Sequence, residues 1–400
     1  MNGLKAQTRV IIGLGTAQTL AWGSTYYLPA ILAAPMAHEL GVSTGVVFAA
    51  FSGALVVAAV LGPLAGRRID LSGGRDMLAA SNLVFAAGLA LLGAAPGSVT
   101  LVFAWLIIGC GMAMGLYEAA FSTLAGLYGR EARGAITGIT LLAGFASTVC
   151  WPVSAYLEAE VGWRMTCFVW AAAHVVLGLP LNRVLVPLGK QATSPATNDP
   201  ASTLPVAGNG VQKHAALLLA LVFAVTWFTS TAMAAHLPRI LQDAGATPVA
   251  AVAAAALVGP AQVAGRLVEF SVLQRVHPLL SARLASVAHP LGAIAVMVFG
   301  APAAAVFAIL HGAGNGILTI ANGTLPLAIF GPAGYGLRQG VLMIPARFGQ
   351  AAAPFLFALL MERYGVSAVN RRGTLTPDRR PILTPPLCAS SAAQGRSCGA

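Results

Sequence analysis

Long apolar stretches recur along most of the chain, and they restrict its fold more than any short motif does. A helix needs about 20 mostly apolar residues to cross the hydrocarbon core of a bilayer. Eleven segments reach that length, at about 9–32, 44–66, 77–95, 99–127, 135–157, 165–185, 215–240, 248–273, 279–300, 302–330 and 340–361. With 57% hydrophobic and only 9% charged residues, the chain is predicted to be an all-α membrane protein that crosses the lipid bilayer many times.

The basic residues between these stretches predict the orientation. If the N-terminus is cytoplasmic, the outer loops hold Arg164, Arg239 and Arg363, and the cytoplasmic segments hold Lys5, Arg9, Arg67, Arg68, Arg75, Arg130, Arg133, Arg183, Lys190, Lys213, Arg275 and Arg338. Short loops that stay in the cytoplasm are enriched in Lys and Arg. We therefore expect a multi-pass protein of a bacterial-type cell inner membrane with a cytoplasmic N-terminus.

Other classes of function are not indicated. The formal net charge is +11, but the Lys and Arg residues form short clusters instead of one basic face, so no nucleic-acid partner is expected. The cysteines show neither a disulfide framework nor a metal-ligand spacing. No phosphate-binding loop and no nucleophile motif occurs in the sequence. We expect no metal, no cofactor and no enzymatic activity.

The second half of the chain repeats features of the first. Leu28-Pro29-Ala30-Ile31-Leu32 recurs as Leu237-Pro238-Arg239-Ile240-Leu241, about half a chain later. The intervening segment 186–214 is rich in Pro, Ser, Thr, Asn and Gly, as linkers are. We expect a six-helix N-terminal lobe at 1–185, a cytoplasmic linker at 186–214 and a five-helix C-terminal lobe at 215–365. Two parallel repeats of this kind build transporters whose substrate site lies between the lobes, near the middle of the bilayer.

The loop at 66–75, GRRIDLSGGR, resembles the signature loop between the second and third helices of the major facilitator superfamily, and the Gly-Trp-Arg sequence at 162–164 is also similar to that superfamily. The resemblance spans about residues 9–365. It implies six helices per lobe and a central cavity that opens alternately to each side. Gly66, Asp70, Gly74 and Arg75 are then candidates for a conformational switch, with Asp70 against a helix N-terminus or an arginine of the other lobe. The alternative is a solvated turn with basic orientation signals.

Two arginines of the C-terminal half are candidate substrate ligands. When the halves are aligned without a gap, Arg266 falls inside the eighth helix, above its cytoplasmic end. That helix then looks like the one in monocarboxylate transporters and oxalate–formate antiporters, where an arginine holds a substrate carboxylate. Arg347 is similarly placed to a basic residue in the eleventh helix of the oxalate–formate family. Gln262 stands where the monocarboxylate family has an aspartate, so the resemblance does not carry over that acidic partner of Arg266.

A guanidinium group suits a carboxylate because its fork of donors matches two oxygens. We therefore expect Arg266 and Arg347 to bind substrate. The alternatives are that either side chain reaches the membrane interface, or that Arg266 pairs with Glu269.

Glu118 lies near the middle of the apolar stretch 101–128. An ionisable group at that depth is costly unless it is paired or faces water. We expect Glu118 to carry a proton during transport or to contact substrate; the alternative is a structural pair with an arginine of the other lobe or of a neighbouring helix. Tyr26, Tyr27, Tyr117, Trp227 and Asn315 are further candidates for substrate contact, although for any single one an interhelical packing contact is the commoner outcome.

The end of the chain departs from the repeat. The repeat predicts a twelfth helix after Gly365, but the segment 366–400 is rich in Pro and Arg and contains no apolar stretch that approaches a span. We interpret this segment as a disordered tail that replaces helix 12, produced by a frameshift near Ala368, so that the chain is a truncated transporter.

Together these features predict a monomeric secondary active transporter that works by alternating access. Its expected partners are a small organic anion of the monocarboxylate type, which is the substrate, and coupled protons. The alternatives are proton-coupled efflux of drugs or other apolar compounds, a channel, and an inactive truncated transporter.

Overall fold

The computed structural model describes residues 2–188 and 210–364, and every element in these two ranges is a helix. The N-terminal half contains α1 (Asn2–Ala21), η1 (Trp22–Tyr26), α2 (Pro29–Glu39), α3 (Thr44–Ser72), α4 (Arg75–Gly93), α5 (Ser98–Gly115), α6 (Tyr117–Tyr128), η2 (Gly129–Glu131), α7 (Ala132–Ala143), α8 (Ala146–Ala173), η3 (His174–Gly178) and η4 (Leu181–Leu185). The C-terminal half contains α9 (Gly210–Asp243), α10 (Pro248–Ala256), α11 (Val258–Ser271), η6 (Leu273–Arg275), α12 (Pro278–Phe299), η7 (Ala301–Ala303), α13 (Ala304–Phe330) and α14 (Tyr335–Tyr364).

The predicted all-helical membrane fold is confirmed. Within residues 2–188 and 210–364, eight helical segments are long and apolar enough to cross a membrane. One of them, Ser98–Leu185, is 88 residues long and turns back at η2 and again at Gly162, so it supplies three crossings. The helices α1 and α2 together form the first crossing. With it, the helices of the described residues are compatible with the eleven predicted crossings. Most of the expected linker at 186–214 and all of the expected tail at 366–400 lie outside the described residues.

The turn at Gly162 depends on glycine. Its φ of 78° and ψ of 165° lie inside what is otherwise continuous helix, and residues with a Cβ rarely adopt a positive φ. The chain therefore reverses between the fifth and sixth crossings without a longer loop.

Several crossings are broken near their middle, which the apolar pattern does not predict. The stretch 99–127, expected as one helix, is two helices, because Leu116 has an extended conformation (φ −83°, ψ −168°). Gly115 precedes the break, where a Cβ would collide with the side chains of Ser81 and Phe85. As a correction to that expectation, Glu118 lies in the first turn of α6 instead of deep within one helix.

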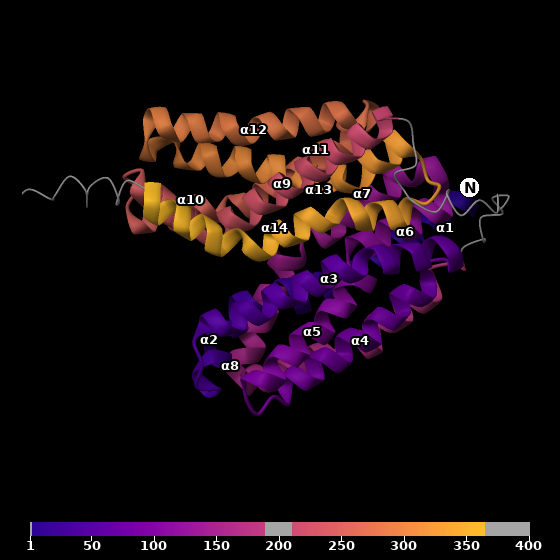
Figure 1. The fold of residues 1–400 in the computed structure, drawn as a ribbon, viewed down its shortest axis with the longest axis horizontal. Helices are drawn as coiled ribbons and strands as arrows, with labels where there is room; N and C mark the ends of the chain where they lie inside the picture. The colour runs from indigo at the N-terminus through magenta and orange to yellow at the C-terminus, as the bar shows by residue number, and fades with distance from the viewer. Residues whose placement is uncertain (1, 189–209, 365–400) are drawn as a thin grey trace, which may run out of the picture.

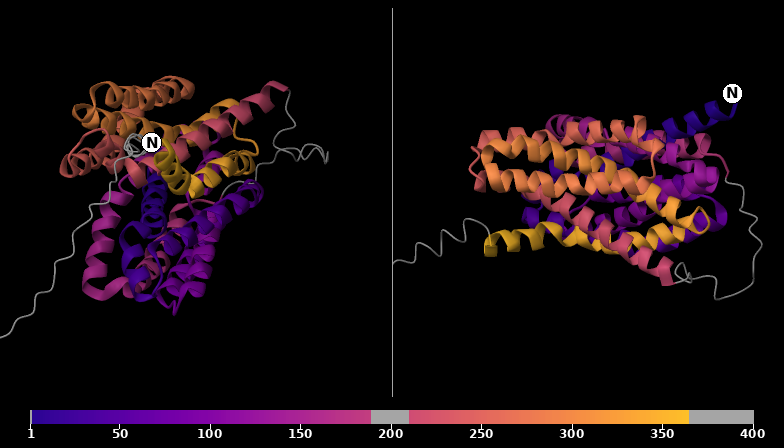
Figure 2. Two further views of the ribbon diagram at one scale, coloured as in Figure 1. Left: turned by 60° about the vertical axis from the view of Figure 1, so that its left-hand side comes forward. Right: turned by 90° about the horizontal axis from the view of Figure 1, so that it is seen from above.

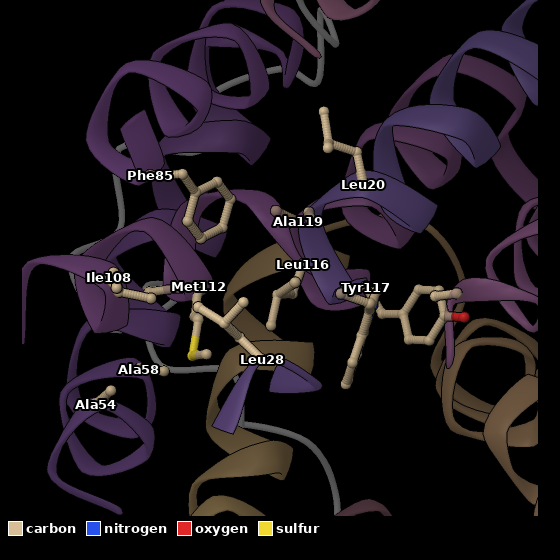
Figure 3. Close-up of a cluster of buried hydrophobic side chains, with 14 of the residues drawn as sticks. Leu20, Leu28, Ala54, Ala58, Phe85, Ile108, Met112, Leu116, Tyr117 and Ala119 are labelled. Atoms are coloured by element: carbon tan, nitrogen blue, oxygen red, sulfur yellow. The ribbon is translucent and has the colours of Figure 1, made fainter. Parts of the chain in front are cut away.

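The largest apolar core belongs to the N-terminal half. Leu28, Met112 and Leu116 lie together in the centre of Figure 3, and Phe85 and Ile108 lie beside them. All five side chains are almost completely buried. This packing fixes the end of α5 and therefore the start of α6, where Glu118 is found.

The two halves meet along α3 and α14, which run side by side (Figure 1); Figure 2 shows most of the helices running in roughly the same direction. The backbones approach closely where Gly66 faces Gly336 and Gly62 faces Gly340. Small residues permit such close helix contacts within a membrane. The α3–α14 seam is thus set by backbone contact, and a larger side chain there cannot be absorbed by a rotamer change.

We expect Gly66→Ala to destabilise this arrangement, because the added Cβ would collide with the carbonyl of Gly336. Overpacking of this kind typically costs about 1–3 kcal/mol. Thermal unfolding in detergent measures the effect. Gly126→Ala on α6 is the matched control, because its Cβ would meet nothing within 4 Å. Equal melting temperatures for the two variants would contradict the proposed tight seam.

Candidate functional site

An ion pair joins the two halves near the middle of the molecule. Arg347 Nη2, on α14, donates to both carboxylate oxygens of Glu118, on α6, at 2.8 and 2.9 Å. The side chains are 4% and 17% exposed, respectively. The N-terminal position of Glu118 in α6 adds favourable helix-dipole interaction with its carboxylate. Of the alternatives for Glu118, the structure therefore contains the pair with an arginine of the other half.

A chain of hydrogen bonds extends this pair across the junction. Arg347 Nη1 donates to Gln350 Oε1 at 3.0 Å, and Gln350 Nε2 donates to the hydroxyl of Tyr26 at 3.2 Å. The Tyr26 hydroxyl also lies 3.5 Å from the hydroxyl of Thr231 on α9. Gln350 and Thr231 were not singled out by the sequence. Position 350 lies three residues beyond Arg347, and this helical spacing was the available signal.

Arg266 is buried in α11 and has no acidic partner among the described residues. It is 5% exposed, and its Nε and Nη1 atoms have no hydrogen-bond partner among the described residues. Its charge acts on the hydroxyls of Tyr27 and Tyr117. Neither alternative for Arg266 is seen: the side chain does not reach the surface, and Glu269 bonds instead to Arg133 at 2.9 Å.

Space for the Arg266 guanidinium comes from a break between α7 and α8. At Gly144 a Cβ would collide with Arg266 Nη1. The φ of −61° and ψ of −24° at this position are compatible with any residue. The absence of a side chain therefore matters here only for the room it leaves. The sequence alone does not indicate Gly144, because the pairing of α7 with α11 is a tertiary contact.

Both arginines are close to an aromatic cluster, which is formed by Trp22, Tyr26, Tyr27, Tyr117 and Trp227. The Trp22 ring centroid is 4.9 Å from that of Tyr117 and 5.1 Å from that of Tyr26. Trp22 also stacks on Trp227 of the other half, with centroids 6.3 Å apart and planes at 6°. Arg347 Cζ is 5.9 Å from the Trp227 ring.

Four of the five candidate cavity residues are thus brought together, and Trp22 joins them. Trp22 was not predicted, because it lies within an apolar stretch, although it is one helical turn before Tyr26 and so on the same face. Asn315, on α13, has no side-chain hydrogen bond to this cluster in the described part of the chain; its carbonyl accepts from Thr319.

The candidate switch residues lie between the last two turns of α3 and the start of α4. The Asp70 carboxylate accepts hydrogen bonds from the backbone N–H groups of Gly336 and Leu337, both at 2.8 Å, at the start of α14. Gly66 contacts Gly336, and at Gly74 a Cβ would collide with Thr123. Arg75 forms a 3.3 Å ion pair with the exposed Asp76.

A second contact at the same end of the junction was not anticipated. Arg133, on α7, donates to Glu269 and to the carbonyls of Leu273 and Val276, which follow α11. The two halves are therefore held together by Asp70, which binds the start of α14, and by Arg133, which binds α11 and the residues after it.

The charges of the central site do not balance. It contains two buried arginines, Arg266 and Arg347, and one carboxylate, that of Glu118, which is paired with Arg347. A buried charge is stable only when it is paired or hydrogen-bonded. The site therefore suits an additional anion close to Arg266.

We expect Glu118→Gln to lower the free energy of unfolding by about 2–4 kcal/mol, because it leaves Arg347 buried without a counter-charge. The double variant Glu118→Gln/Arg347→Gln should recover a large part of that loss. Denaturant unfolding in detergent measures the cycle, with the exposed Glu160→Gln as the control for a carboxylate-to-amide change. Additive effects of the two substitutions would mean that the pair contributes no coupling energy.

Comparison with known proteins identifies the family. The sequence matches the family model described as Major Facilitator Superfamily over residues 14–304, whereas no curated protein matches it significantly. The fold is similar to that of the human organic anion transporter MFSD10, with a TM-score of 0.67, 17% identity, and coverage of 90% of this chain and 94% of that chain.

The fold is also similar to that of the E. coli fucose:proton symporter FucP, with a TM-score of 0.64, 15% identity, and coverage of 88% and 98%. For the proton:xylose symporter XylE the TM-score is 0.62 at 14% identity, with coverage of 90% of this chain and 89% of that chain. At such identities the similarity establishes the fold alone. Because the family model matches most of the chain, the chain belongs to the major facilitator superfamily, whose members are secondary transporters and not enzymes.

Proposed function

We propose that this transporter moves a small organic monoanion, of the monocarboxylate type, together with a proton. The observation that supports it most directly is Arg266, a buried guanidinium whose Nε and Nη1 donors have no partner among the described residues. Leaving such a group unpaired is costly, and an anion that binds there removes the cost. A carboxylate is the preferred anion, because its two oxygens match the guanidinium fork.

The position of Arg266 fits this role. It lies in the broken crossing formed by α10 and α11, opposite the break between α7 and α8 at Gly144. Discontinuous helices near the bilayer midplane are typical of substrate sites in two-lobed transporters. Similarity to a structure described as an organic anion transporter is in keeping with the proposal, although at 17% identity it supports the fold only.

Glu118 is the proposed proton carrier. A proton that binds a Glu118 oxygen neutralises the carboxylate, and both N–H···O bonds from Arg347 then lose their charge assistance. Because Glu118 and Arg347 belong to different halves, this weakens a contact that holds the halves together. Uptake of one anion and one proton adds no net charge to the site, so the loaded and empty transporter carry the same charge and the complete cycle moves no net charge across the bilayer.

Asp70 and Arg133 are the proposed closing contacts on the side from which the substrate is excluded in this state. Both must break when the halves rotate, as alternating access requires. We assign that side to the cytoplasm of a bacterial-type inner membrane, from the distribution of basic loop residues, and we propose that the monomer is the working unit.

One observation favours the alternative of exporting apolar compounds. A cavity of about 810 Å³ lies between α9, α12, α13 and α14 and is lined mostly by apolar side chains. All of its lining residues belong to the C-terminal half, and neither Glu118 nor Arg266 is among them. The cavity is thus not in contact with both halves, as a site for coupled transport would be. Anion transport remains the better-supported function.

Carboxylate binding is predicted to stabilise the wild-type protein against heat, through preferential binding to the folded state. Arg266→Gln should weaken carboxylate affinity about 10- to 100-fold, the loss expected for a charged hydrogen bond. Gly144→Ala should weaken it as well, because its Cβ displaces the guanidinium. Gly134→Ala, on α7, which ends just before Gly144, is the matched control, because its Cβ would meet nothing within 4 Å. Stabilisation by cationic drugs but not by carboxylates would overturn the assignment.

Uptake of a carboxylate into proteoliposomes is expected to accelerate when an inward pH gradient is imposed. Glu118→Gln should remove this acceleration but keep exchange of labelled for unlabelled substrate, because exchange needs no net proton movement. If the Gln variant still responds to the gradient, Glu118 is not the proton carrier. If trans-side substrate never accelerates uptake, the protein is a channel instead of a carrier.

A further inference from the structure

We infer that the substrate is a flat aromatic monocarboxylate, whose carboxylate binds Arg266 and whose ring lies between Trp22 and Trp227. This inference rests on the proposed function and specifies the part of the substrate to which the carboxylate is attached. It depends on three observations: the charge balance, the geometry of the two tryptophans and their unpartnered N–H groups.

The charge balance restricts the ligand to one negative charge. Arg347 is already neutralised by Glu118, to which it makes a two-oxygen contact. While Glu118 forms this ion pair, Arg266 is therefore the only one of the two site arginines left to neutralise the charge of a ligand. In this state a dianion would bring a second charge into the membrane interior without a partner, and a cation would be repelled by Arg266.

The two tryptophans form a parallel pair that spans the junction. Trp22 lies in η1 of the N-terminal half and Trp227 in α9 of the C-terminal half. Their planes differ by 6° and their centroids are 6.3 Å apart. Carbon atoms in optimal contact are about 3.5–4.0 Å apart, so two parallel rings that hold a third between them have planes about 7 Å apart. Separation of the halves along the normal to the two tryptophan planes would admit a flat ring between Trp22 and Trp227, whereas a bulky non-planar group requires a larger separation.

Several buried N–H donors in and near the tryptophan pair have no hydrogen-bond acceptor among the described residues. The indole Nε1 atoms of Trp22 and Trp227 are buried and have no hydrogen-bond partner among the described residues, as is true of Arg266 Nε and Nη1. Indole N–H groups and guanidinium groups donate and cannot accept. Ligand oxygens, either of the carboxylate or of a substituent on the ring, are what such atoms bind.

The remaining rings connect the two ends of the proposed site. Tyr117 packs on Trp22 at 4.9 Å and lies within the field of Arg266. A molecule that reaches from Arg266 to the tryptophan pair therefore passes an aromatic wall along its length. Rings that pack against rings contribute beyond the area they bury, so the cluster selects aromatic carboxylates over aliphatic ones.

The test is a calorimetric comparison of ligands on the full chain in detergent, with acetate, cyclohexanecarboxylate, benzoate, phthalate and benzamide as probes. Benzoate is expected to bind about 10- to 100-fold more tightly than acetate, the ratio that two ring contacts and their buried area supply. Cyclohexanecarboxylate should be weaker than benzoate because it is not flat. Phthalate, a dianion, and benzamide, which is neutral, should both bind poorly.

Variants assign the preference to the tryptophans. Trp22→Leu and Trp227→Leu should lower the ratio of benzoate to acetate affinity, whereas Trp22→Phe and Trp227→Phe should keep most of it. Trp170→Leu removes a buried tryptophan outside the cluster and serves as the matched control for loss of volume. A folded Leu variant with the wild-type ratio would overturn the assignment of the ring site.

The outcomes separate this inference from the proposed function. Equal affinities for acetate and benzoate would overturn the aromatic specificity and leave anion transport intact. Tight binding of benzamide, unaffected by Arg266→Gln, would overturn anion transport and the inference together. Phthalate binding as strongly as benzoate would contradict the single-charge argument.

Discussion

The bond between Glu118 and Arg347 is the constraint on which the rest of this structure depends. Near the middle of the molecule it joins a carboxylate of one half to a guanidinium of the other, and each would be unstable there alone. Its presence neutralises one of two buried arginines and leaves Arg266 as the excess charge. The same pair thus links the halves mechanically and sets the charge that a substrate must bring.

Broken helices make this arrangement possible. The break at Leu116 places Glu118 in the first turn of α6, the distortion at Trp22–Tyr26 directs aromatic rings toward the junction, and the break at Gly144 makes room for Arg266. A continuous helix satisfies its own backbone and has no reason to expose polar ends at this depth. These three irregularities of the backbone lie where the charged and aromatic side chains of the site meet.

The sequence predicted the crossings and the buried ionisable groups, because hydrophobic length and the cost of burying charge are properties of local sequence. Glu118, Arg266 and Arg347 are recognisable as residues that do not belong in an apolar stretch. Their partners were not predictable. Whether Glu118 binds a proton, a substrate or Arg347 depends on how two halves dock, and Gly144 and Trp22 gain their roles only through contacts between distant segments. The break at Leu116 was missed because the residues around it are as apolar as those of an intact helix.

The most direct measurement is an experimental structure with bound 4-bromobenzoate, in which anomalous scattering from bromine locates the ring independently of the protein. Binding as proposed places the carboxylate within hydrogen-bond distance of Arg266 and the bromine beside Trp22 and Trp227. Bromine in the apolar cavity between α9 and α12, with Arg266 still unbonded to the ligand, would contradict the assignment of Arg266 as the anion site.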